Sequence, residues 1–145
     1  MSFRCRCDQK LNRKEYHRAL CSIVGILSKL TISLEIVMTR VCREAGTRVQ
    51  TNVFLRDLDI TVPVTDNRRI EVIANGTPLN GGVQIAIDTT MISILRGDGR
   101  PRPRATERRA VAIADAEKSK RVRYPELDGG GRCKLILFAI EVHGR

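Results

Sequence analysis

Residues 68–93 read RRIEVIANGTPLNGGVQIAIDTTMIS, and this segment decides the fold. It contains two runs rich in β-branched residues, 69–74 and 83–95, which predict two strands. Between the runs lie Asn75–Gly76 and Gly81–Gly82, which are typical of a tight connection. A short connection favours antiparallel neighbours, so we expect the two strands to pair.

The other predicted elements extend this pair into an α/β domain. A partly alternating run at 48–60 predicts a strand ahead of the pair, which gives a three-stranded meander. Around it we expect a helix over 15–45 that breaks near Thr31–Ser33 and ends at Gly46, a loop over 96–104, a helix over 105–123 and a strand over 134–142. The last run, KLILFAIEV, is almost continuously apolar, which predicts a strand buried on both faces in the middle of the sheet. The order helix, three-stranded meander, helix, strand predicts a mixed sheet flanked by helices.

The distribution of charge favours a nucleic-acid partner. The chain of 145 residues has a formal net charge of +10. Residues 1–18 have a net charge of +4 and residues 96–123 a net charge of +6, so the remainder is neutral. Lys and Arg neutralise phosphates, which indicates a polyanion partner; a solubilising surface is the alternative. Aromatic residues make up only 3%, which argues against a platform that stacks single-stranded bases.

Two other classes of protein are not favoured. Residues 20–38 are apolar-rich but contain Lys29 and Glu35, so we do not expect a membrane-spanning helix. The five cysteines are odd in number and irregularly spaced, which favours reduced thiols. A weaker alternative is a zinc site formed by Cys5, Cys7, His17 and Cys21. Its first two cysteines are separated by one residue, which is closer than the usual spacing of zinc ligands.

Acidic and basic residues in the second half of the chain indicate phosphodiester chemistry. Glu71 and Asp88 lie in the two strands of the first paragraph, and Lys118 and Lys120 lie in the helix that follows. Carboxylates bind Mg²⁺ and Mn²⁺, and a lysine beside them can stabilise charge on a phosphate. Asp88 interrupts an apolar strand, where an unpaired carboxylate would be unfavourable.

Four blocks of the sequence are similar to one known family. They are VCREAGTRVQTNVFLRDLDI, RRIEVIANGTPLNGGVQIAIDTTMIS, KSKRVRYPEL and LILFAIEVHGR. With them, residues 37–145 resemble the endonuclease-like C-terminal domain of non-LTR retrotransposon reverse-transcriptase polyproteins. The resemblance implies a restriction-endonuclease-like core of the PD-(D/E)XK type, a DNA partner and a nuclear location. It also implies that residues 35–145 form a C-terminally truncated endonuclease domain and that residues 1–34 precede it as an unassigned basic segment and helix.

The resemblance implies roles for particular residues. Glu71 and Asp88 correspond to the carboxylates that hold Mg²⁺ or Mn²⁺, although family members often have Asp where Glu71 stands. Thr90 occupies the position of the usual lysine, and retrotransposon versions place that lysine on the next helix, ahead of a tyrosine. Lys120 precedes Tyr124 by four residues, on the same helix face, which favours Lys120 over Lys118 as the catalytic lysine. We expect DNA contacts from Arg96, Arg100, Arg102, Arg104, Lys118 and Arg121.

Several alternatives stay open from the sequence. The domain is either an active Mg²⁺-dependent endodeoxyribonuclease that nicks DNA, or a catalytically inactive nucleic-acid-binding remnant, or a fragment without a selected function. Glu71 could instead form an ion pair with Arg68 or Arg69 at a strand end. Glu141 is expected to pair with a neighbouring basic residue, and Glu44 is a further candidate metal ligand.

Overall fold

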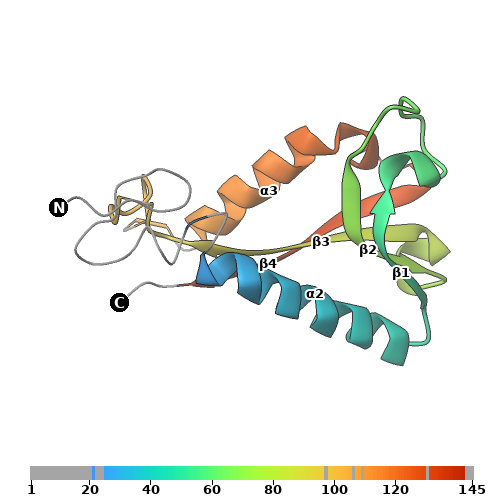
Figure 1. Ribbon diagram of the computed structural model, residues 1–145, viewed down its shortest axis with the longest axis horizontal. Coiled ribbons are helices and arrows are strands. Elements are labelled where there is room, and N and C mark those ends of the chain that lie inside the picture. The colour runs from blue at the N-terminus through green and yellow to red at the C-terminus, as the bar shows by residue number, and fades with distance from the viewer. Residues whose placement is uncertain are drawn as a thin grey trace. The chain divides into compact units, whose positions relative to one another are not determined.

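The computed structural model describes residues 21, 25–96, 98–105, 107–108, 110–129 and 131–142. Its elements follow the chain in this order: α2 (Ile26–Glu44), β1 (Arg48–Phe54), a 3₁₀ turn (Leu55–Asp57), β2 (Arg69–Asn75), a 3₁₀ turn (Leu79–Gly82), β3 (Gln84–Ser93), α3 (Val111–Arg123), a 3₁₀ turn (Pro125–Leu127) and β4 (Cys133–Val142) (Figure 1). Among the described residues, no helix is both long enough and apolar enough to cross a membrane.

The strands form one mixed sheet in the order β1-β2-β3-β4. β1 pairs antiparallel with β2, and β2 pairs antiparallel with β3, so the predicted meander is confirmed. The chain then passes through α3 and returns beside β3 as β4 (Figure 1). For the described residues, the structure therefore confirms an α/β fold with a mixed four-stranded sheet and two helices.

Contacts divide the chain into two compact units. Residues 34–89 and 117–138 form one, which we call the meander unit. The other, which we call the loop unit, contains residues 90–116 together with described residues from both ends of the chain. Both acids and both lysines selected from the sequence lie in the meander unit.

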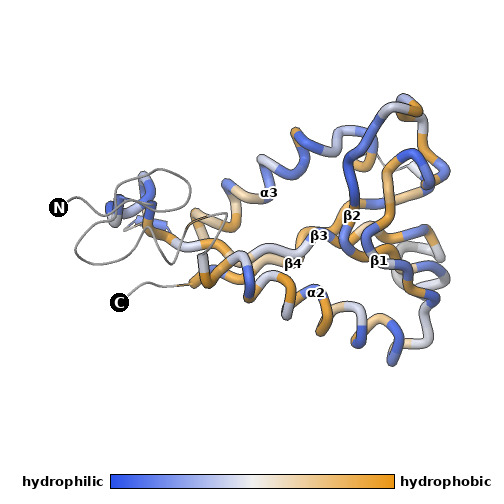
Figure 2. Tube along the Cα trace, viewed as in Figure 1, coloured by the Kyte–Doolittle hydropathy of each residue, from blue (hydrophilic) through white to orange (hydrophobic). Residues whose placement is uncertain are grey.

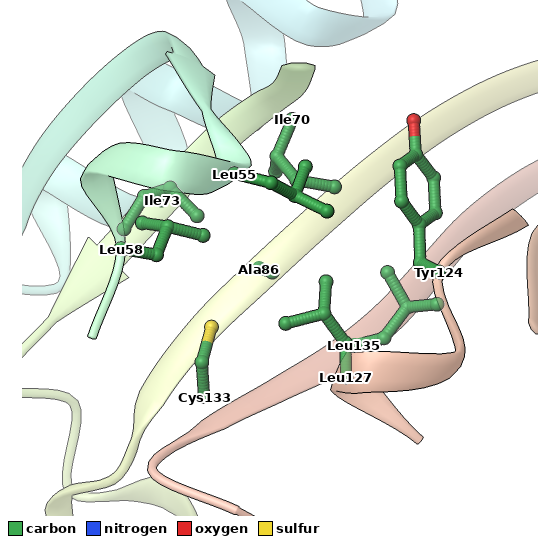
Figure 3. Packing of buried hydrophobic residues seen from close by; sticks show 9 residues of the cluster. All are labelled: Leu55, Leu58, Ile70, Ile73, Ala86, Tyr124, Leu127, Cys133 and Leu135. Atoms are coloured by element: carbon green, nitrogen blue, oxygen red, sulfur yellow. The ribbon is translucent and has the colours of Figure 1, made fainter. Parts of the chain in front are cut away.

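Both faces of the central strands in the meander unit are covered. On one face, a buried group formed by Val72, Ala74, Ile85 and Ile87 packs against Met38 and Cys42 of α2. On the other face lies a larger cluster made by Leu55, Leu58, Ile70, Ile73, Ala86, Tyr124, Leu127, Cys133 and Leu135 (Figure 3). Over Val72–Ala74 of β2 and Ile85–Ile87 of β3, successive residues alternate between the two clusters, which is why these segments are apolar at every position.

The position of β4 differs from the prediction. β4 is the last strand in the order, so it forms an edge of the sheet and not its middle. Only Cys133 and Leu135 are buried in it, while Phe138 and Ile140 are 37% and 38% exposed. The two-sided burial that the apolar run at 134–142 predicted belongs instead to β2 and β3.

The helix predictions need smaller corrections. α2 is continuous through Thr31–Ser33, where a break was expected, and Thr31 Oγ1 donates a hydrogen bond to Leu27 O at 2.9 Å. The helix ends before Gly46, whose φ of 79° is the left-handed conformation expected of a C-terminal stop. α3 begins at Val111 and not at 105. Hydrophobic and hydrophilic residues are interspersed along α2, and several of its apolar residues, among them Ile32, Ile36 and Val37, are exposed (Figure 2).

Candidate functional site

Asp88 and Lys120 form an ion pair in the meander unit. Asp88 follows Ala86 by two residues on β3 and therefore lies on the same face as the larger cluster. Lys120 Nζ donates a hydrogen bond to Asp88 Oδ1 at 2.7 Å. The Asp88 side chain is 3% exposed and the Lys120 side chain 22%. The lysine thus provides the compensation that a buried carboxylate requires, and one side of the pair reaches solvent.

The spacing of residues along α3 explains why Lys120 reaches the sheet. Ala112 and Ala116 are the buried residues of α3, and Lys120 continues this row at the next four-residue step. Small side chains on that row let the helix approach its neighbours, and a lysine at its end can extend toward β3. Lys118 is exposed, so the two lysines that the sequence placed together lie in different surroundings.

The Glu71 carboxylate accepts two hydrogen bonds from Thr89. Glu71 Oε2 lies 2.6 Å from the backbone nitrogen of Thr89 and 2.5 Å from Thr89 Oγ1. The nitrogen belongs to the peptide group that joins Asp88 to Thr89, so the Glu71 carboxylate lies within one residue of the second acid. Thr89 is 1% exposed, so both donors would be buried without a partner if this carboxylate were removed.

The sheet is irregular at Glu71. The pairing of β2 with β3 ends at Val72 and Ile87, one step before Glu71 would face Asp88. On the other side, the pairing of β1 with β2 omits the step at which Asn52 would face Glu71, and Asn52 has a φ of 55°. The side chain of Glu71 therefore supplies an acceptor where a regular ladder would supply a backbone carbonyl.

Glu71 does not take part in the ion pair that the sequence offered as an alternative. Arg68 instead donates to Asp66 and Glu126, each at 2.6 Å through its Nη2 atom. These hydrogen bonds hold the pKa of the Asp66 and Glu126 carboxyls below their ordinary values. Arg68 also donates to the carbonyl of Arg123, so it joins the start of β2 to the end of α3.

Tyr124 provides a second connection between α3 and β2. Its backbone nitrogen donates to Lys120 O at 2.9 Å, and its hydroxyl donates to Arg69 O at 3.0 Å. The tyrosine is 2% exposed, and its ring lies among the side chains of the larger cluster (Figure 3). Burial, followed by the negative charge of Asp88, raises the pKa of the Tyr124 hydroxyl. Tyr124 and Arg68 thus fix the helical turn that carries Lys120.

The carboxylates have the donor chemistry that hard divalent cations require. Mg²⁺ commonly binds one or two carboxylates and keeps several water molecules. Asp88 and Glu71 fit this requirement, since each has a second oxygen besides the one engaged by Lys120 or Thr89. Among the described residues, no group of three or more His, Cys, Asp or Glu side chains could hold a metal ion. Glu44 forms an exposed pair with Arg40 at 2.7 Å.

Glu35 adds a carboxyl group near Glu71. Glu35 lies on α2, and burial together with the negative charge of Glu71 raises the pKa of its carboxyl group. The sequence did not single out Glu35, because it lies in a segment that otherwise reads as an ordinary amphipathic helix.

The arginines expected to contact DNA differ in their surroundings. In the loop unit, Arg100 lies 4.0 Å from Asp98, and Arg102 lies 3.7 Å from Asp115 while donating to Ser93 O. Arg104 has a φ of 64° and lines a cavity with Arg108. In the meander unit, Arg121 donates to Glu117 and Asp128. The described part of the chain shows no ion pair for Arg96.

Two other predictions concern residues away from Asp88, Lys120 and Glu71. Glu141 was expected to pair with a basic residue, but its Oε2 accepts a hydrogen bond at 3.1 Å from the backbone nitrogen of Ala112, in the first turn of α3. A carboxylate is favourable there because the first N–H groups of a helix have no partner within it. Cys5, Cys7 and His17, which the zinc alternative requires, lie outside the described residues.

A comparison of the sequence with protein-family models and with curated proteins found no match to either.

Proposed function

We propose that this chain is a restriction-endonuclease-like domain that nicks DNA with Mg²⁺ or Mn²⁺. The observation that carries the proposal is the pair formed by Lys120 and the buried Asp88. In the proposal, Asp88 and Glu71 are metal ligands and Lys120 is the catalytic cation. A retroelement context and a nuclear location belong to the same proposal.

The proposed chemistry divides the work between the acids and the lysine. A bound divalent cation would lower the pKa of its water and neutralise charge on the phosphate. Lys120 would hold a non-bridging phosphate oxygen, since an ammonium group stabilises the negative charge that develops there. Tyr124 and Arg68 would act as positioning residues, because they fix the end of α3.

A second candidate function is a catalytically inactive domain that binds nucleic acid. The observation that favours it is that both acids already have partners, Thr89 for Glu71 and Lys120 for Asp88. In this case the pair would stabilise the fold and the basic surface would bind phosphates. A fragment without a selected function is the third alternative, and a non-cooperative thermal transition would indicate it.

Nicking of supercoiled plasmid DNA in Mg²⁺ and in Mn²⁺ tests the proposal. We expect Asp88→Asn to lower the rate by about 100-fold or more, as loss of a metal ligand or electrostatic group does. Lys120→Met should lower it by about tenfold or more, whereas Lys29→Met, at an exposed lysine of α2 that has no role in the proposal, should stay within about threefold.

The outcomes separate the candidate functions. Metal-dependent nicking that survives Asp88→Asn would show that the site is wrongly assigned. A folded wild-type protein that binds DNA without nicking it in either metal would support the inactive alternative.

A further inference from the structure

Three arginines of the meander unit lie over aromatic rings, and none of them forms an ion pair with another described residue. Arg56 and Arg69 lie over the ring of Phe54, with their Cζ atoms 4.3 Å and 3.8 Å from its centroid. Arg123 lies over the ring of Tyr124 at 5.3 Å. None of the ion pairs among the described residues includes Arg56, Arg69 or Arg123.

The fold places Arg56 and Arg69 on Phe54. Phe54 ends β1 and pairs in register with Arg69, the first residue of β2. Arg56 follows in the 3₁₀ turn, and its Nη1 donates to Val64 O and to Asn67 Oδ1, both at 3.3 Å. Both arginines are exposed, so their remaining N–H groups face solvent.

One hydrogen bond links the strand that carries Arg69 to the end of α3 within the meander unit. The carbonyl of Arg69 accepts the hydrogen bond from the Tyr124 hydroxyl. Tyr124 in turn follows Lys120 by one helical turn and bears Arg123 on its ring. The bond between Arg69 O and the Tyr124 hydroxyl therefore joins the strand that carries Arg69 to the end of the helix that carries the candidate catalytic lysine.

We propose that Arg56 and Arg69, stacked on Phe54, form a pre-ordered binding surface for the phosphodiester backbone of nucleic acid. A guanidinium group binds phosphate through two parallel N–H groups and stays charged at any physiological pH. A ring beneath it fixes its plane before the ligand arrives, which reduces the entropy lost on binding. Arg68 lies in the same region but is neutralised by Asp66 and Glu126, so it holds the structure together and does not belong to this surface.

The inference rests on the proposed function only for its nucleic-acid partner, and it needs no metal. It adds residues that the sequence did not select, since we expected contacts from the loop after β3 and from α3. The aromatic rings here support arginines, which is compatible with a composition too poor in aromatics to stack bases.

Binding to a 20-base-pair DNA duplex and to an RNA duplex of the same sequence tests this surface. Affinity would be measured by fluorescence anisotropy in EDTA over a range of salt concentrations. We expect Arg69→Gln to weaken binding about tenfold and to reduce the slope of log affinity against log salt by about 1. The duplex that responds more strongly identifies the natural backbone, and a response from either supports the surface.

Two control variants separate the surface from general basicity. Arg40→Gln removes the same charge from an exposed arginine that is paired with Glu44, and it should change affinity by less than about twofold. Phe54→Leu keeps every charge, so it should weaken binding by about threefold while leaving the salt slope unchanged. Equal effects of Arg69→Gln and Arg40→Gln would overturn the inference, and so would an affinity that is insensitive to Phe54→Leu.

The binding measurement and the nicking assay test the two proposals separately. Binding that depends on Arg69 without any nicking would overturn the proposed catalysis and leave the surface intact. Nicking without dependence on Arg69 would overturn the surface and leave the catalytic proposal intact. Thermal melting of each variant, unchanged within about 2 °C, would show that these substitutions do not act through stability.

Discussion

Glu71 and Asp88 would face each other if the register of β2 and β3 continued by one step, yet their carboxylates are held in different ways. Asp88 depends on a charge brought by another element, since Lys120 comes from α3. Glu71 accepts from Thr89 of the neighbouring strand and replaces part of a hydrogen-bond ladder. Neighbouring acids in one sheet can therefore be held by different means. The carboxylate of Asp88 is held by a residue of a helix, and that of Glu71 by the local geometry of the backbone.

The largest effect on stability should come from truncating Glu71. Glu71→Ala leaves the buried N–H and hydroxyl of Thr89 without an acceptor, so we expect it to lower the free energy of unfolding by about 3 kcal/mol. Glu71→Gln keeps a carbonyl oxygen as an acceptor and should lower it by less than about 1 kcal/mol. Urea unfolding measures both, and equal losses would mean that Glu71 contributes through its charge.

A double-mutant cycle tests the dependence of Asp88 on α3. We expect Asp88→Asn and Lys120→Met to be coupled by about 1–2 kcal/mol in the free energy of unfolding, because each removes one partner of a largely buried pair. Glu71→Gln and Lys120→Met should be coupled by less than about 0.5 kcal/mol, since these residues share no hydrogen bond in the described structure. Similar coupling in both cycles would show that the two acids and the lysine act as one network.

Removing one hydroxyl should have a smaller effect. Tyr124→Phe keeps the ring in the core but loses the hydrogen bond to Arg69 O, so we expect a loss of about 1 kcal/mol in urea unfolding. This bond fixes the end of α3, so the variant should also weaken the coupling between Asp88 and Lys120. An unchanged coupling would show that Arg68 alone positions the helix.

The smallest expected effect is a change in the free energy of unfolding at low pH. Hydrogen bonds from Arg68 hold the pKa of the Asp66 and Glu126 carboxyls below their ordinary values. A lowered carboxyl pKa contributes stability that is present above the unfolded value and is lost as the pH falls through the folded value. The wild-type protein should therefore exceed Arg68→Gln in stability above about pH 5 and lose that advantage as the pH falls below about 4. An advantage that persists at pH 2 would assign it to packing of the guanidinium group.

The sequence could predict the meander because its strands are runs of β-branched or alternating residues bounded by turn residues. It could not predict the position of β4 in the sheet, because an apolar run has the same pattern in an edge strand and in a central strand. The position follows from the strand order, in which β4 lies last, beside β3. Lys120 could be placed by its four-residue spacing from Ala116 and Tyr124. The partner of Glu71 could not, because Thr89 is 18 residues away and bonds at an irregular point of the sheet.

The left-handed conformation of Asn52 marks a point near Glu71 at which the sheet can open locally. Both ladders are interrupted at Glu71, and Asn52 stands at one of these interruptions. Amide protons near such a point exchange with solvent through local opening, which requires less free energy than unfolding of the whole unit. Native-state hydrogen exchange should therefore be faster for Thr89 than for Ile87, although both are buried in the same strand. Access to the two acids can then fluctuate while the packed clusters on either side of the sheet stay closed.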